Sequence, residues 1–126
     1  MNSLNGQYHY RSFCPQAGTK DTAPELAAPW TPPGKLTAQT DASGKVTATL
    51  SFGPGRDLAV TGTITPAAGN TPEGIQLTGE GLGATYKIRG YFLEGSNHLT
   101  GTVAAVANDV ARQPIGTRGP FVLFPV

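Results

Sequence analysis

The chain has 126 residues, 17 of them Gly and 11 Pro, and its formal net charge is +1 at pH 7. So much Gly and Pro excludes long helices, and the length favours a single domain. Only 13% of the residues are charged, and the two signs nearly balance. This near-neutral balance excludes a nucleic-acid binder that works through a broad basic face.

The first predicted strand, residues 7–13, is rich in the aromatic residues that strands favour. A long irregular segment follows, residues 14–34, and it holds five of the eleven prolines. Irregular segments of this length in a compact domain are usually functional or disordered. Because proline restricts the unfolded chain, we expect an ordered, lid-like loop.

Period-2 alternation of apolar and polar residues continues from there to the C-terminus. Seven further runs are predicted as strands: 35–40, 45–52, 58–65, 75–81, 84–93, 98–107 and 121–124. Short turns join most of them, and a second irregular segment, residues 108–119, precedes the last. One apolar and one polar face per strand is typical of an antiparallel sheet that buries one side.

An internal repeat runs through three of these strands: Val60-Thr61-Gly62, Leu77-Thr78-Gly79 and Leu99-Thr100-Gly101. In each, an apolar residue and a glycine face inward around an outward threonine. Glycine inside a strand marks a bend or a place where something approaches the backbone closely. Two interpretations stay open: the glycines let the sheet coil, or they leave internal space for a ligand.

Eight strands without a crossover helix predict an all-β fold: a single-domain, eight-stranded antiparallel up-and-down barrel over residues 1–126, which has no exposed edge. An eight-stranded sandwich is the alternative. The opening Leu4-Asn5-Gly6-Gln7-Tyr8 and the repeated Leu-Thr-Gly resemble the calycins, the lipocalin-like and avidin-like barrels. This resemblance implies that the long first loop, residues 14–34, folds over an open mouth.

In such a barrel the two irregular segments lie at the same end, and we expect the mouth there. An apolar throat with a few polar groups at its rim is the usual form of a small-molecule site. The candidate ligand-binding residues are Tyr8, Tyr10, Arg11, Trp30, Arg56, Tyr86, Arg112 and Phe121. The alternative for the arginines, that they are solvated loop charges, stays open.

Three tyrosines, Tyr8, Tyr10 and Tyr86, are the candidate catalytic residues. With inward hydroxyls they could orient a ligand, or act as acid and electrophile in an isomerase or cyclase. The alternative is that they are packing residues with a hydroxyl handle. If His9 and Arg11 faced inward instead, they would need an acidic partner or an anionic ligand.

We expect no metal and no cofactor. The two histidines, His9 and His98, lie on different predicted strands, and the single Cys14 has no metal-ligand spacing around it. Whether the protein is an enzyme stays open.

The leading hypothesis is a small-molecule-binding β-barrel that holds an apolar or amphipathic ligand beneath the 14–34 loop. One alternative is a cofactor-free isomerase or cyclase in the same pocket. Another is a structural or assembly subunit, for example a homo-oligomer, that uses the Thr-rich outer faces. We do not expect nucleic acid as a partner, because the net charge is near zero. We do not expect a membrane either, because most of the strands are shorter than a membrane barrel requires. The opening Met-Asn-Ser-Leu-Asn-Gly lacks the basic and apolar regions of a secretory signal, which predicts a cytoplasmic protein.

Overall fold

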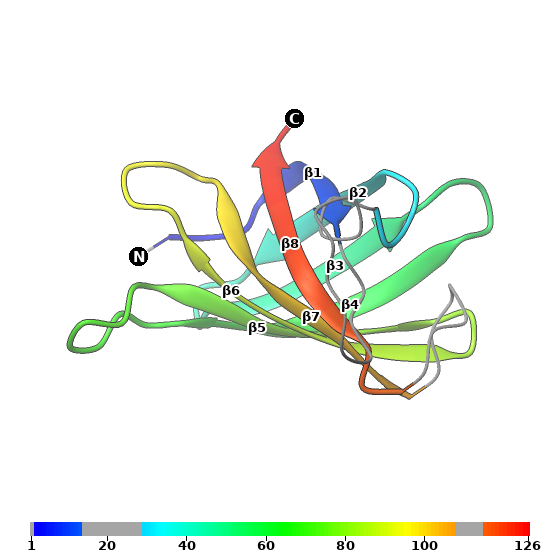
Figure 1. The fold of residues 1–126 in the computed structure, drawn as a ribbon. Coiled ribbons are helices and arrows are strands. Elements are labelled where there is room, and N and C mark those ends of the chain that lie inside the picture. The colour runs from blue at the N-terminus through cyan, green and yellow to red at the C-terminus, as the bar shows by residue number, and fades with distance from the viewer. Residues whose placement is uncertain (1, 14–28, 108–114) are drawn as a thin grey trace.

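The computed structural model describes residues 2–13, 29–107 and 115–126. The strands are β1 (Gly6–Ser12), β2 (Gly34–Thr40), β3 (Lys45–Ser51), β4 (Asp57–Thr65), β5 (Gly74–Gly81), β6 (Ala84–Phe92), β7 (Leu99–Ala107) and β8 (Arg118–Pro125). Each pairs antiparallel with the next, and β8 pairs with β1 to close a barrel (Figure 1). The predicted all-β, eight-stranded barrel is therefore confirmed, and the sandwich alternative is wrong. Within the described ranges, no helix has the length and apolar content needed to cross a membrane.

Alternation along each strand sorts its side chains between the interior and the outer face. Along β3, Val46, Ala48 and Leu50 are buried. The threonines between them, Thr47 and Thr49, are exposed. Because the sheet closes on itself, every strand has two partners and the barrel presents no free edge for pairing with another chain.

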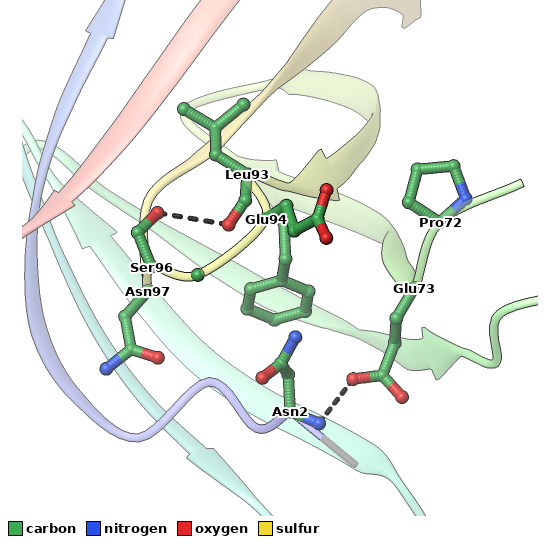
Figure 2. A pocket seen from close by; sticks show the side chains of 9 residues that line it. Asn2, Pro72, Glu73, Leu93, Glu94, Ser96 and Asn97 are labelled. Carbon is green, nitrogen blue, oxygen red and sulfur yellow. Dashed lines mark hydrogen bonds between the residues drawn. The ribbon is translucent and has the colours of Figure 1, made fainter.

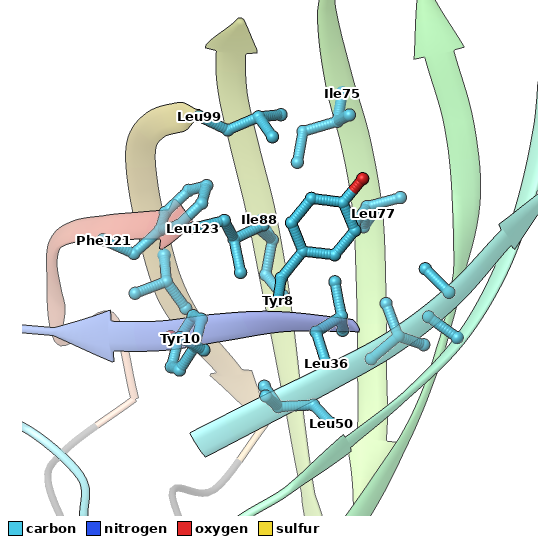
Figure 3. Packing of buried hydrophobic residues seen from close by; sticks show 14 of the residues in the cluster. Tyr8, Tyr10, Leu36, Leu50, Ile75, Leu77, Ile88, Leu99, Phe121 and Leu123 are labelled. Carbon is cyan, nitrogen blue, oxygen red and sulfur yellow. The ribbon is translucent and has the colours of Figure 1, made fainter. Parts of the chain in front are cut away.

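The interior is filled with side chains from all eight strands. Figure 3 shows Tyr8 and Tyr10 projecting from β1 toward aliphatic side chains that other strands contribute, among them Leu36, Leu77 and Leu123. Tyr8 and Tyr10 are only 3% and 4% exposed. The two tyrosines are therefore part of the core.

Two of the repeat glycines allow the sheet to coil. A Cβ atom added at Gly62 or Gly101 would overlap a carbonyl oxygen of the neighbouring strand. At Gly79 it would meet only ordinary contacts, the nearest being Val60 Cγ2 at 3.6 Å. Gly62 and Gly101 therefore fit the interpretation that the glycines let the sheet coil. Gly79 does not leave internal space for a ligand, because neighbouring side chains occupy the space over its backbone.

The N-terminal segment closes one end of the barrel with Leu4, which has no exposed surface. The Leu4 N–H donates to Thr40 Oγ1, and the Thr40 hydroxyl donates to the Leu4 carbonyl, both at 2.9 Å. Asn5 Oδ1 accepts from the Thr40 N–H at 2.8 Å. These three hydrogen bonds hold the segment across the end where the β2–β3 turn lies.

The predicted irregular segments are each too long at their C-terminal end. Gly34 belongs to β2, and β8 begins at Arg118 rather than after residue 119. Pro120 lacks an N–H donor, a feature that by itself argues against a strand at this position. In an antiparallel ladder the N–H and C=O of a residue point to the same side. The Pro120 carbonyl accepts from the Phe13 N–H at 3.0 Å, just beyond the end of β1, so the missing donor costs the sheet little.

Candidate ligand site at the barrel mouth

The end opposite Leu4 is the barrel mouth, formed by the end of β1, the start of β2 and the β3–β4 turn. A cavity of about 10 Å³ lies there, with aromatic walls from Tyr10, Trp30, Phe52 and Tyr86. A volume of this size holds roughly one water molecule. Among the described residues, side chains therefore pack the barrel core, and this space at the mouth is small.

Trp30 covers the cavity from the end of the predicted lid. Its N–H donates to the Ser12 carbonyl at 2.9 Å, and the preceding Pro29 forms an isolated bridge with Phe13. The indole is 7% exposed and meets the Tyr86 ring edge-on, with centroids 6.2 Å apart and planes at 76°. A short contact with the end of β1 therefore places the only tryptophan of the chain over the mouth.

Tyr10 joins two further aromatic rings at this end. It stacks on Phe121, with centroids 6.0 Å apart and planes at 22°. It also meets Phe52 at 6.0 Å and 69°. Phe121 is fully buried, whereas Phe52 is partly buried, so the aromatic cluster extends from the core to the rim.

Two hydroxyl-bearing residues of the mouth are almost completely buried. Ser12 is 2% exposed, and its Oγ lies 3.3 Å from Thr31 Oγ1. Thr117 has no exposed surface, and its Oγ1 has no hydrogen-bond partner within the described part of the chain. The Thr117 carbonyl accepts from the Ala105 N–H, and Ala105 is the ladder partner of Tyr86. An unsatisfied buried hydroxyl lowers the stability of a protein by about 1–3 kcal/mol. Here one strand, β7, lies between Thr117 and Tyr86 of the aromatic wall.

The structure brings part of the predicted ligand-binding set together. Tyr10, Trp30 and Tyr86 line the mouth cavity, and Phe121 supports Tyr10 from below. Tyr8 lies toward the closed end instead. Its hydroxyl is 3.2 Å from both the N–H and the carbonyl oxygen of Asn5. Of the three candidate catalytic tyrosines, two therefore share the mouth.

Two of the predicted arginines, Arg11 and Arg56, do not line the cavity. Arg11 projects from the outer face of β1, and its Nη1 donates to the Tyr10 carbonyl at 2.9 Å. Arg56 is exposed in the β3–β4 turn. Arg112, with residues 14–28 of the predicted lid, lies outside the described residues.

A wider, open cleft of about 480 Å³ lies at the closed end, between the N-terminal segment and the β6–β7 turn (Figure 2). The Glu73 carboxylate there accepts from the Asn2 N–H, and the Ser96 hydroxyl donates to the Leu93 carbonyl. The sequence reasoning did not single out these turn residues, which carry no motif. Among the described residues, no group of three His, Cys, Asp or Glu side chains is arranged to hold a metal ion.

Asp41, in the β2–β3 turn, is a titratable residue whose pKa is shifted. The Ser43 hydroxyl donates to its carboxylate at 2.7 Å, and the Lys45 N–H donates to the same oxygen at 3.0 Å. These hydrogen bonds, the Ser43 hydroxyl first, lower the pKa of Asp41. The charged Asp41 carboxylate therefore stabilises the β2–β3 turn, and this turn lies at the end of the barrel away from the mouth.

No family model matches the chain, and neither the curated proteins nor the solved structures include a significantly similar one. What the chain shares with the calycins is the closed, eight-stranded antiparallel barrel.

Proposed function

We propose that this protein is a calycin-like binding barrel that takes a small apolar or amphipathic molecule at the mouth, beneath Trp30. The observation that carries the proposal is the asymmetry of the two ends. Leu4 closes one end through hydrogen bonds to Thr40. At the other end, aromatic side chains that include Trp30 line a small cavity.

In this proposal the conformation in which Trp30 packs against Tyr86 is the closed one. Small-molecule pockets occupy about 300 Å³ or more, whereas the mouth cavity is about 10 Å³, so a ligand enters only when Trp30 moves. The Pro29–Trp30 segment is suited to such a movement because it meets β1 through one isolated bridge and not through a ladder. Each 100 Å² of apolar ligand surface removed from water contributes about 2.5 kcal/mol, which offsets the lost Trp30 contacts.

Buried hydroxyls support a ligand that carries a polar group beside its apolar body. Thr117 Oγ1 lacks a partner within the described residues. The Ser12–Thr31 pair offers a second pair of hydroxyl oxygens at the cavity wall. A ligand hydroxyl or carbonyl that reached either position would gain a hydrogen bond in a site sheltered from water.

The proposal is tested with N-phenyl-1-naphthylamine, a neutral apolar dye whose emission rises in an apolar site. We expect saturable binding with a dissociation constant in the micromolar range, about −8 kcal/mol. Energy transfer from Trp30, the single tryptophan, to the dye should accompany it. Absence of a saturable signal at high micromolar dye would overturn the proposal.

Two variants that add the same bulk localise the binding. Val103 lines the cavity, so Val103→Phe fills it. Val106, on the same strand, is 43% exposed on the outer face, so Val106→Phe adds an equal ring away from the cavity. We expect Val103→Phe to lose dye affinity at least about tenfold and Val106→Phe to keep it, with circular dichroism verifying that both fold. Equal affinities would place the dye elsewhere.

A further inference from the structure

A third hollow, of about 590 Å³, lies on the outer face of β1, β2 and β3, next to the mouth. Three basic side chains line it: His9, Arg11 and Lys35. His9 and Lys35 are direct partners across the β1–β2 ladder. Arg11 is two residues further along the same face of β1, so the three side chains converge on one surface.

The basic groups of this outer groove have no acid beside them. Among the described residues that line the groove there is no carboxylate. Following the ladders from Lys35, the first acid is Asp57, which lies beyond Ser51 and is exposed. Hydroxyls add further donors, because Thr37, Thr49 and Ser51 also line the groove. Cationic and hydroxyl donors without a competing carboxylate suit an oxyanion, and the Arg11 guanidinium is held in place by its bond to the Tyr10 carbonyl.

Phe52 separates the outer groove from the mouth cavity, because it lines both. Its ring lies over Gly34, where an added Cβ would be 3.0 Å from Phe52 Cε1. The absence of a side chain at position 34 therefore lets the ring lie there. Phe52 follows β3 and is only partly buried, so turning it aside joins the apolar cavity to the basic groove.

We propose that the ligand of this barrel is an amphipathic anion. Its oxyanion head group (carboxylate, sulfonate or phosphate ester) binds in the outer groove at Arg11 and Lys35, with His9 beside them. Its apolar part lies at the mouth beneath Trp30, past a displaced Phe52. This inference rests on the proposed function and adds the chemical class of the ligand to it.

The test compares two dyes that share one ring system. 1-Anilinonaphthalene-8-sulfonate carries an anionic group that N-phenyl-1-naphthylamine lacks. We expect the sulfonate to bind more tightly than the neutral dye, and the advantage to shrink as salt screens the charges. In Arg11→Ala/Lys35→Ala the sulfonate should bind about tenfold more weakly, because the two exposed positive charges that pair with its head group are removed. The neutral dye should bind that variant within about twofold of the natural chain.

Lys87→Ala/Arg89→Ala is the matched control. It removes the same two positive charges from exposed positions on β6, and sulfonate binding should be unchanged. If the natural chain binds both dyes equally, or the two double variants weaken the sulfonate equally, the head-group subsite is wrong. If the neutral dye does not bind at all, the proposed function itself fails. Displacement of the sulfonate dye by decanoate or by decyl phosphate then identifies the preferred oxyanion, and displacement by neither would also overturn the subsite.

Phe52→Leu tests the connection between the two spaces. The smaller side chain keeps an apolar residue at the rim but removes the ring that lies over Gly34. We expect the sulfonate dye to associate several-fold faster with this variant, while the fold, followed by circular dichroism, is retained. An unchanged association rate would show that the Phe52 ring does not obstruct the ligand between the mouth cavity and the outer groove.

Discussion

The indole of Trp30 stands edge-on to the phenol ring of Tyr86, at 6.2 Å between centroids and 76° between planes. One ring comes from the residues just before β2 and the other from the buried face of β6. Edge-to-face pairs of this kind contribute about 0.5–1.5 kcal/mol beyond the area that they bury. Under the proposed function this contact closes the mouth, and breaking it is the first step in admitting a ligand.

Removing the indole should destabilise the barrel and also open it. Trp30→Ala is expected to lower the free energy of unfolding by about 3 kcal/mol, within the usual range for large aromatic truncations. Trp30→Phe keeps an aromatic ring against Tyr86 and should cost less than half as much. Urea unfolding followed by circular dichroism measures both. Equal losses would mean that the aromatic contact contributes nothing to closure.

The inward glycines should differ in their tolerance of a methyl group. Gly62→Ala and Gly101→Ala drive a Cβ into the backbone of the neighbouring strand. Each should destabilise the protein by about 2 kcal/mol or more. Gly79→Ala meets nothing nearer than 3.6 Å and should change stability by less than about 1 kcal/mol. Thermal unfolding of the three variants tests the assignment. A large loss at Gly79 with none at Gly62 would contradict it.

The Leu4 side chain should be the main apolar group that closes the end of the barrel opposite the mouth. Leu4→Ala removes a fully buried side chain and should cost about 2–4 kcal/mol. Gln7→Ala, at an exposed position of β1, serves as the control and should change stability by less than about 0.5 kcal/mol. If denaturant unfolding showed Leu4→Ala to be as stable as the natural chain, the N-terminal segment would not hold this end closed.

Asp41 should make the β2–β3 turn sensitive to acid. Its pKa is lowered in the folded protein, so its charged form stabilises the fold above the ordinary aspartate pKa of about 3.9. That contribution is lost as the pH falls through the lowered pKa. We therefore expect Asp41→Asn to melt below the natural chain at pH 7, with the gap closing toward about pH 2. Ser43→Ala removes the main cause of the shift and should behave in the same way. A gap independent of pH would contradict this account.

The barrel could be predicted because its residues repeat one signal. Alternations such as Val46-Thr47-Ala48 assign both the strand and its buried face. The start of β8 was predicted too late, and Pro120 explains why such an error arises. A proline usually indicates that a strand does not include it, and here it is tolerated because the partner strand β1 ends at Ser12. Ladder register of that kind is not visible within one strand.

The site was predictable only in part, for the same reason. The alternation of β1 put Tyr8 and Tyr10 on one face, but it left open which face points inward, and it could not show that Tyr8 reaches back to Asn5. The pairing of His9 with Lys35 depends on how two strands align across the long intervening segment, and no local pattern in the sequence specifies that register. Leu4 is a lone apolar residue among polar neighbours, which is too weak a signal to predict the closure of one end.

The central claim is that a ligand enters under Trp30, and observing the bound ligand's neighbours tests it most directly. In NMR spectra of the complex with N-phenyl-1-naphthylamine, we predict intermolecular nuclear Overhauser effects from the dye to the Trp30 indole, the Tyr86 ring and the Val103 methyls. Effects confined to exposed apolar side chains such as Leu82, Ile115 or Phe124, with the Trp30 and Val103 signals unmoved, would contradict the claim.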